Sequence, residues 1–316
     1  MLSAVFAAIA PVFVIILAGF WVRRSGILSE EADASLMRIY VNLLYPCLIA
    51  NKILGNEALH QSVNLWLPPL AGAATMGVGF VFCWLGARLL RIPRGPSTRT
   101  FTYVTGAYNY VYTAVPVIGS LFGDKTLGVL FLFNLGTEVA FWVGTGLILA
   151  NSSGMGLWRR IFNVPVVTVL ASVALNFLHV REIVSRGQPW ILDALQMLGN
   201  SAIPLALLLT GAVITDFLAD ARPSWADAKA FGGACFLRLG FLPLTFLALA
   251  CLLPCSLELK QVLIVQAAMP AGMLPVALCK HHGGDVGLSV QIVIGTTAIA
   301  LLTIPHWISL GWRLAL

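Results

Sequence analysis

The chain reads Gly106-Ala-Tyr-Asn-Tyr-Val-Tyr-Thr-Ala-Val-Pro-Val-Ile-Gly-Ser-Leu-Phe-Gly-Asp124 within an apolar region that is long enough to cross a lipid bilayer. A continuous helix does not favour the Val115-Pro116 step, because proline lacks a backbone donor and pushes the preceding residue out of the helical conformation. The sequence therefore predicts that the helix breaks at Pro116, close to the polar Asn109. In hydrocarbon, unpaired backbone groups are costly, so such a break is expected only where protein or a water-filled cavity satisfies them.

A second stretch of this kind lies in the other half of the chain and reads Gln266-Ala-Ala-Met-Pro-Ala-Gly-Met-Leu-Pro275. Pro116 and Pro275 are each followed by a short apolar run and then by Gly-Asp. Interrupted apolar segments at matching places in two halves of a membrane protein point to the binding site of a transporter. We therefore expect the two stretches to build one site together.

Composition places the chain among membrane proteins with many spans. Hydrophobic residues make up 59% of the sequence and charged residues 10%, and the mean hydropathy is +0.90, which leaves no room for a sizeable soluble domain. The net charge of +6 does not favour a nucleic-acid partner, because the basic residues lie at the ends of apolar spans, where membrane topology explains them. The six cysteines show no metal-binding spacing, so we expect small buried side chains and neither a metal nor a cofactor.

Ten apolar segments are each long enough for a membrane span, which needs about 20 residues. Their ranges are 3–22, 32–54, 65–90, 100–122, 126–150, 161–179, 190–217, 228–253, 259–281 and 286–312. No basic residue precedes the first segment, so we expect a span there and not a cleaved signal peptide. The loops after odd-numbered spans carry more Lys and Arg than the other loops, which predicts that both termini lie on the non-cytoplasmic side.

Several features recur in the two halves of the chain at nearly the same separation. The matching pairs are Asn42-Leu-Leu-Tyr-Pro46 with Asn200-Ser-Ala-Ile-Pro204, Pro116 with Pro275, and Gly136-Thr137 with Gly295-Thr296. They favour two tandem halves, residues 1–155 and 156–316. Because a unit of five spans ends on the side opposite its start, the second half must be inverted. We therefore predict an all-α polytopic membrane protein with ten transmembrane helices, whose broken helices 4 and 9 cross at the midplane.

The predicted crossing suits a negatively charged ligand, because the starts of half-helices offer N–H groups and partial positive charge to an anion. Asn109 lies at the break and Thr113 lies one turn later, where their side chains can bind the substrate or satisfy loose backbone carbonyls. The sequence leaves both roles open. Pro116 and Pro275 frame the site, and the position seven before Pro275 is Ala268, so the polar groups come mainly from the first half.

Glu138 is the one carboxylate well inside a predicted span. Acidic residues inside membranes are costly and usually functional, as proton relays or as partners of a cation. The structural alternative is a protonated carboxyl bonded to a neighbour such as Arg238, or to a backbone carbonyl. Arg238 can instead extend its side chain to the cytoplasmic surface. The remaining candidate substrate-binding residues are Asn134, Gln266 and Asn42.

Enzymatic motifs do not occur in this sequence. It contains no HExxH, no GxSxG, no Gly-rich phosphate loop and no carboxylate pair placed for acid–base chemistry. We therefore expect that the protein is not an enzyme. Asp124 and Asp285 each follow a broken helix and are expected to cap the next helix, while Lys280-His281-His282 is expected to be a solvated edge.

The motifs, in their order and spacing, resemble those of the auxin efflux carrier family, which includes the plant PIN auxin exporters and bacterial permeases associated with malonate and malate. The resemblance covers nearly the whole chain. It rests on Gly26-Ile-Leu-Ser-Glu-Glu31, Asn42-Leu-Leu-Tyr-Pro-Cys-Leu-Ile49, Asn109 with Pro116, Leu198-Gly-Asn-Ser-Ala-Ile-Pro-Leu-Ala-Leu207, and Ala267-Ala-Met-Pro270 followed by Gly283-Gly-Asp285.

The resemblance implies a scaffold of spans 1, 2, 6 and 7 and a transport domain of spans 3 to 5 and 8 to 10. It also implies an elevator-type movement, a homodimer formed through the scaffold, and a place in the bacterial inner membrane. The chain differs from the plant exporters in its short loop at 151–160 and in the lack of a charged pair in span 3. These differences favour an organic-acid permease.

Three functions remain open from the sequence. The leading hypothesis is a secondary transporter of a small organic anion, such as malonate, malate or an auxin-like acid, with the lipid bilayer as its surroundings. The alternative is a sodium- or proton-coupled symporter like the bile-acid family, whose ion ligands could come from Glu138, Asn134 and Gln266 alone. A membrane receptor that does not transport is the third, and it would need a signalling domain or a large loop that this sequence lacks.

Overall fold

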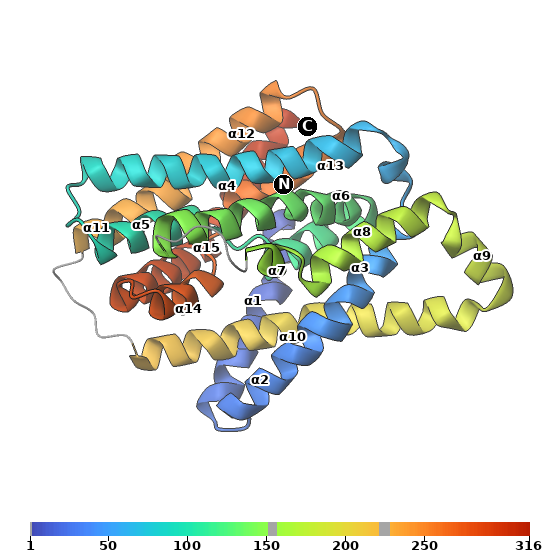
Figure 1. Cartoon of the computed structure of the whole chain (residues 1–316), viewed down its shortest axis with the longest axis horizontal. Coiled ribbons are helices and arrows are strands. Elements are labelled where there is room, and N and C mark those ends of the chain that lie inside the picture. The colour runs from blue at the N-terminus through green and yellow to red at the C-terminus, as the bar shows by residue number, and fades with distance from the viewer. Residues whose placement is uncertain (1, 151–156, 221–227) are drawn as a thin grey trace.

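The computed structural model describes residues 2–150, 157–220 and 228–316. In chain order its first elements are α1 Leu2–Arg24, α2 Glu30–Ile39, the π-helix η1 Tyr40–Leu44, α3 Tyr45–Ile53, the short 3-10 helix η2 Glu57–His60, α4 Val63–Leu89, α5 Pro96–Gly106, α6 Ala114–Gly144 and the π-helix η3 Thr145–Ala150. The later elements are α7 Leu157–Ile161, α8 Val164–Phe177, α9 Val180–Gly187, α10 Pro189–Asp220, α11 Ala228–Phe236, the π-helix η5 Leu237–Phe241, α12 Leu242–Leu252, α13 Leu257–Ala268, α14 Leu274–His281 and α15 Val286–Ala315. Figure 1 shows α4 and α10 along opposite edges of this helical assembly.

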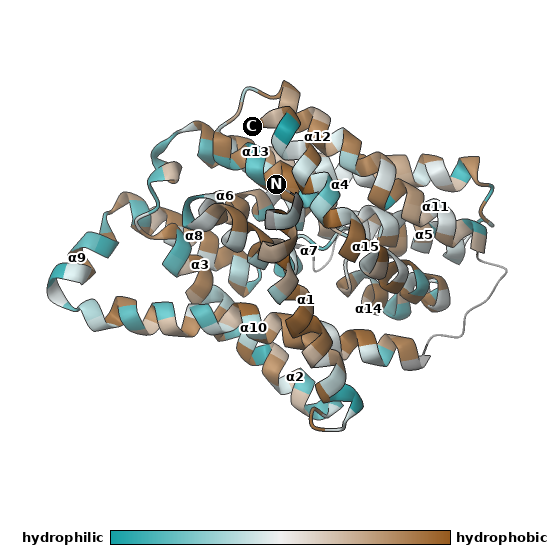
Figure 2. Ribbon diagram, turned by 180° about the vertical axis from the view of Figure 1, so that it is seen from behind, coloured by the Kyte–Doolittle hydropathy of each residue, from teal (hydrophilic) through white to brown (hydrophobic). Residues whose placement is uncertain are grey.

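Six helices in the described ranges are long and apolar enough to cross a membrane. They are Val5–Arg24, Val63–Leu89, Ala114–Leu149, Pro189–Leu218, Ala228–Leu252 and Val286–Ala315. The pair α8 and α9 passes the same test together, although it bends by 76°, and it would be a seventh. Apolar residues also cover the outside of these helices (Figure 2), and Leu17, Leu70 and Met197 are among those exposed. Helices that are hydrophobic on all sides are typical of chains surrounded by lipid.

Glycines bring two pairs of long helices into close contact. A Cβ atom at Gly19 or Gly211, between α1 and α10, or at Gly72 or Gly136, between α4 and α6, would lie 1.7 to 2.1 Å from a backbone oxygen of the partner helix. Only glycine allows helix backbones to approach this closely. Gly72 therefore lies in a helix contact of α4, whereas Gly77 on the same helix has open space around it.

The chain is not helical at 107–113, between α5 and α6, or at 269–273, between α13 and α14. An isolated antiparallel bridge pairs Tyr108 with Ala271, so the two segments lie side by side. Pro116 lies in the first turn of α6, two residues after its start. The interruption therefore precedes the proline instead of falling at it, because proline fits the first turn of a helix, where its missing N–H is not needed.

The predicted helix cap at Asp285 is confirmed, because its side chain accepts a hydrogen bond at the start of α15. The side chain of Ser29 does the same at the start of α2. Asp124 follows a break in α6 at Gly123, whose φ is 77°, but within the described ranges its side chain accepts no capping hydrogen bond, so the predicted cap is wrong. The carboxylate of Asp124 instead pairs with Lys52 at 2.9 Å.

Candidate functional site

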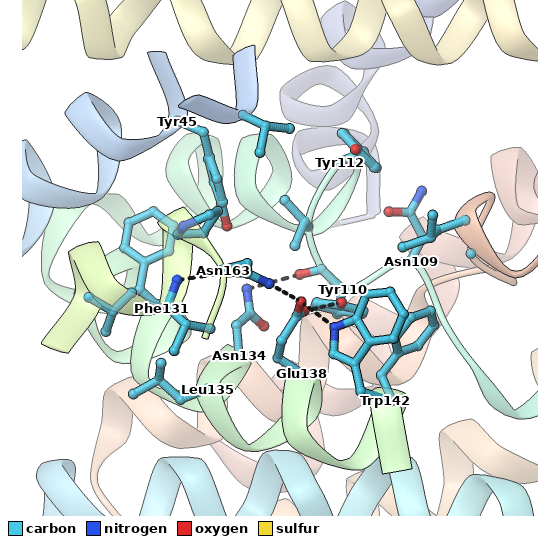
Figure 3. Close-up of a pocket in the computed structure, with 18 of the residues that line it drawn as sticks. Tyr45, Asn109, Tyr110, Tyr112, Phe131, Asn134, Leu135, Glu138, Trp142 and Asn163 are labelled. Carbon is cyan, nitrogen blue, oxygen red and sulfur yellow. Dashed lines mark hydrogen bonds between the residues drawn. The ribbon is translucent and has the colours of Figure 1, made fainter. Parts of the chain in front are cut away.

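A cavity of about 240 Å³ lies beside the two joined non-helical segments. Its walls come from segments far apart in the sequence, and Figure 3 shows many of their side chains pointing inward. The first wall comes from 108–112 and α6, the second from 272–275, and the third from η1, α3, α8 and Asn163 just before α8. The cavity is below the range of about 300–1,000 Å³ that is typical of sites for drug-sized ligands, so it suits a small molecule.

The two non-helical segments satisfy each other's backbone groups. The amide of Asn109 donates to the carbonyl of Pro270 at 2.8 Å, and the amide of Gly272 donates to the carbonyl of Ala107 at 2.8 Å. A Cβ atom at Gly272 would lie 3.2 Å from the carbonyl oxygen of Tyr108. A side chain at position 272 would therefore push the two segments apart by a few tenths of an ångström.

The helices that follow these segments start without a side-chain cap. Thr113 before α6 and Met273 before α14 make no capping hydrogen bond. Leu274 and Pro275, at the start of α14, line the cavity, whereas Thr113 and Pro116 are buried and do not line it. The uncapped start of α14 thus adds partial positive charge beside the cavity.

Asn109 lines the cavity and is only 5% exposed. Its side-chain nitrogen donates to the hydroxyl of Thr113 at 3.0 Å. An amide nitrogen carries two hydrogens, so the second remains available to a ligand oxygen. Thr113 thus orients Asn109, and the structure brings the two together as the sequence suggested.

Glu138 projects from α6 into the cavity and is held by three hydrogen bonds (Figure 3). The hydroxyl of Tyr110 donates to Oε2. The indole of Trp142 donates to Oε1 at 3.0 Å, and the side-chain amide of Asn163 donates to Oε1 at 2.6 Å. The sequence-based alternative of a bond to Arg238 is wrong, since all three partners are neutral groups.

Arg238 lies in η5 and is fully buried, so the prediction that it reaches the cytoplasmic surface is wrong. Its guanidinium carbon lies 5.1 Å from the ring centroid of Tyr108 and 5.4 Å from that of Phe246. In the described part of the chain, none of its three side-chain nitrogens has a hydrogen-bond partner. Because Tyr108 lines the cavity, one aromatic ring separates this cation from the cavity.

Three further candidate residues differ in position. Asn134 lines the cavity, and its amide nitrogen donates to the carbonyl of Tyr110 at 3.3 Å. Gln266 is fully buried behind the wall and donates to the same carbonyl at 3.1 Å. Their side-chain oxygens are buried and, within the described ranges, unpartnered. Asn42 is exposed, donates to the carbonyl of Arg38 at 2.9 Å and does not join the site.

An aromatic part of the cavity was not predicted from the sequence. Tyr40 and Tyr45 stack with their ring centroids 5.4 Å apart, Tyr40 also contacts Tyr112, and Tyr45 meets the ring of Phe131. One signal could have indicated part of this wall, because Tyr45 lies in the repeated Asn-x-x-x-Pro motif. Asn163, just before α8, was also missed, although Asn ahead of Val-Pro is a typical helix start.

Among the residues that the structure describes, no group of three His, Cys, Asp or Glu side chains is placed to hold a metal ion. His281 and His282 are adjacent, and their rings are nearly perpendicular with centroids 4.8 Å apart. The site therefore offers amides, tyrosine hydroxyls, one carboxylate and aromatic faces. Groups of these kinds can bind and orient a small molecule that carries polar groups.

Several apolar helices of membrane length, with a small cavity lined by apolar, aromatic and a few polar side chains, are typical of multi-pass membrane transport proteins. The family comparison identifies the group within this class. The chain belongs to the family described as membrane transport protein, the auxin efflux carrier family, whose model matches residues 4–157 and 148–308. The resemblance found in the sequence motifs is therefore confirmed.

Similar proteins include two archaeal transporters that match along nearly their whole length. An uncharacterized transporter of Methanothermobacter thermautotrophicus is 26% identical over 304 residues, which cover 95% of this chain and 96% of that protein. An uncharacterized transporter of Methanocaldococcus jannaschii is 25% identical over 315 residues, which cover 96% of each chain. An uncharacterized transporter of Saccharomyces cerevisiae is 28% identical over 90 residues, or 28% of this chain and 21% of that protein.

Proposed function

We propose that this protein is a secondary transporter that carries a small organic acid across the membrane by an elevator-type movement. The substrate class comprises mono- and dicarboxylates such as malonate or malate, or an auxin-like acid. The observation that carries this proposal is the position of the cavity, at the junction of the two non-helical segments and between two groups of helices.

The proposed architecture has ten spans in two inverted halves, residues 1–155 and 156–316, with a boundary outside the described residues. Spans 4 and 9 would be α5 with the first part of α6, and α13 with α14. The bend at Gly123 would separate spans 4 and 5. The antiparallel pairing of Tyr108 with Ala271 supports this arrangement, because inverted halves would bring their interruptions together in opposite directions.

Helix packing supports a division into scaffold and transport domain. In the proposed scaffold, α1 packs on α10, and α3 packs on both α8 and α10. In the proposed transport domain, α4 packs on α5 and α6, and α13 packs on α6, α12 and α15. The cavity takes walls from both groups, and the hydrogen bond between Glu138 and Asn163 joins them. Sliding one group along the other would break this bond.

Three features favour an acid as the substrate. Asn109 presents an amide to the cavity, and the uncapped start of α14 lies beside it. Arg238 adds a buried positive charge behind Tyr108. At low effective dielectric, a buried charge acts over several ångströms more strongly than in water, so a carboxylate gains stability near this wall.

Transport by the variant Asn109→Ala tests the proposed site. The purified protein is reconstituted into proteoliposomes, and uptake of radiolabelled malonate and malate is measured. We expect at least a tenfold loss of flux, because a hydrogen bond to a charged group contributes about 1.5–3 kcal/mol. The matched control is Asn42→Ala, which removes an exposed asparagine and should leave flux unchanged. Equal flux in wild type and Asn109→Ala would reject the site.

A sodium-coupled symporter is a second candidate, favoured by the buried oxygens of Asn134 and Gln266. Both are unpartnered among the described residues, and amide oxygens are ligands of hard cations. Replacing sodium by potassium on both sides of the proteoliposome membrane should then abolish uptake. Undiminished uptake in potassium would reject sodium coupling and leave the uncoupled or proton-coupled carrier.

The proposed transporter resides in the cell membrane with both termini on the non-cytoplasmic side. We also propose a homodimer through the scaffold, as the membership of the auxin efflux carrier family suggests. Labelling of a cysteine introduced at either terminus, in a variant without the six native cysteines, by a membrane-impermeant reagent in intact cells tests the orientation.

A further inference from the structure

Glu138 gives the cavity a negative charge that the binding of an acid does not use. Among the described residues that line the cavity, it is the sole acidic side chain, and no Lys, Arg or His joins it. An ionised carboxylate beside a bound acid would repel that acid. Binding of an acid beside Glu138 therefore requires a positive group on the substrate or a proton on one of the two carboxyl groups.

Three hydrogen bonds fix the position of the Glu138 carboxyl group in the cavity. Oε1 accepts from the indole nitrogen of Trp142 and from the side-chain nitrogen of Asn163. The orientation of the Asn163 amide is set independently, because its oxygen accepts from the amide of Val166 at 3.0 Å and caps α8. Two groups that can only donate therefore meet Oε1, and the hydroxyl of Tyr110 donates to Oε2. A carboxylate has room for about four hydrogen bonds, so it can accept one more donor.

The charge of Glu138 has no cationic partner in the described part of the protein. None of the ion pairs found there includes it. The guanidinium of Arg160 lies over the ring of Trp142, 5.5 Å from its centroid, and Arg238 lies behind Tyr108. The bonds from neutral donors hold the carboxylate in place without cancelling its charge.

Aromatic side chains surround this carboxylate. Tyr45, Tyr110, Phe141 and Trp142 line the same cavity, and the ring centroids of Tyr110 and Phe141 are 6.1 Å apart. Aromatic faces attract ammonium groups, and a carboxylate among them completes a site for such a group. Asn109 and the start of α14 line the cavity as well, so one cavity presents groups for a carboxylate and groups for a cation.

We propose that the substrate is a small zwitterion with both a carboxylate and an ammonium group, such as an amino acid. Its carboxylate binds at Asn109 and the start of α14, and its ammonium group donates to Glu138 among the aromatic rings. This inference rests on the proposed transport of organic acids and narrows the substrate class. A ligand such as malonate has a second carboxylate in place of the ammonium group. This carboxylate would lie next to Glu138, so malonate should bind less tightly.

Matched pairs of ligands test the inference. Binding to purified wild-type protein in lipid nanodiscs is measured for L-alanine, L-leucine and L-phenylalanine, and for the acids that lack only the amino group, namely propionate, 4-methylpentanoate and 3-phenylpropionate. At least one amino acid should bind tenfold more tightly than its partner acid. In Glu138→Gln this preference should fall below threefold, because the ammonium group loses its partner and the partner acid is no longer repelled. The exposed Glu182→Gln serves as the control, because it makes the same change outside the cavity.

The wild-type comparison decides the inference even if Glu138→Gln fails to fold. The inference is overturned if the partner acids or malonate bind as tightly as all three amino acids, or if a folded Glu138→Gln keeps the preference. It is also overturned if malonate is transported in proteoliposomes and no amino acid is, an outcome that leaves the proposed organic-acid carrier intact. If neither acids nor amino acids are transported, the proposed function itself fails.

Discussion

The two non-helical segments have similar backbone roles but different chemistry. The first, 107–113, carries three tyrosines, Asn109 and Thr113, and several of these side chains line the cavity. The second, 269–273, reads Met-Pro-Ala-Gly-Met and adds only backbone groups and apolar side chains. The difference shows that two paired interruptions of this kind can have separate roles. One segment supplies polar recognition, and the other lets the backbones meet.

Their alignment also differs from the one that the prolines suggest. Asn109 lies seven residues before Pro116, and the residue seven before Pro275 is Ala268. Ala268, however, is the last residue of α13 and not part of the second segment. In the structure, Ala271 is the residue that pairs across the junction, with Tyr108. The first segment is also longer than the second. The second segment remains without a polar side chain in either alignment.

The largest effect is expected from crowding the second segment with Gly272→Val. A Cβ atom there would lie 3.2 Å from the carbonyl oxygen of Tyr108, and a branched side chain adds further atoms. Overpacking of this kind costs about 1–3 kcal/mol, so we expect a lower melting temperature and loss of transport. The control is Gly232→Val on α11, where no atom lies within 4 Å of the added Cβ. Wild-type flux in Gly272→Val would contradict the tight junction.

A smaller effect is expected from removing the charge behind the first segment with Arg238→Met. Replacing a buried charge by an apolar residue is often neutral or stabilising, so the melting temperature should not fall. Two unit charges about 10 Å apart at an effective dielectric of about 20 interact by roughly 1.7 kcal/mol. We therefore expect about a tenfold loss of affinity for the carboxylate substrate.

Arg238→Lys is the matched variant for this experiment, because it keeps the charge and should retain most of the affinity. If Arg238→Met and Arg238→Lys bind substrate equally, the charge of Arg238 does not act on the cavity.

The smallest effect is expected within the first segment, from Tyr110→Phe. This change removes one donor to Glu138, while Trp142 and Asn163 still hold the carboxylate. A single hydrogen bond contributes about 0.5–1.5 kcal/mol, so flux should fall about threefold. Tyr112→Phe is the control, since its hydroxyl meets only the sulfur of Met37 at 3.8 Å. Equal loss in both variants would show that the hydroxyl of Tyr110 has no special role.

The local chemistry of the sequence located much of the site. Proline and asparagine in an apolar stretch marked the junction, since few other residues disturb a helix in lipid so strongly. Of the candidates named from sequence, Asn109, Asn134, Glu138 and Pro275 line the cavity.

Other parts of the site could not be predicted, because hydropathy gives the length of a helix but not which face it turns to a neighbour. Asn163 and Tyr45 reach the cavity from other helices, and nothing local to Glu138 indicates them. Because burying a charge is costly, we expected the side chain of Arg238 to reach water. Packing on Tyr108 and Phe246 keeps it inside instead.

A cryo-electron microscopy structure in lipid nanodiscs with the transported substrate present tests the central claim most directly. The account predicts substrate density between Asn109, the start of α14 and Glu138, with residues 107–113 and 269–273 non-helical and paired at Tyr108 and Ala271. Substrate density at a different place, or a continuous helix through residues 107–113, would contradict the account.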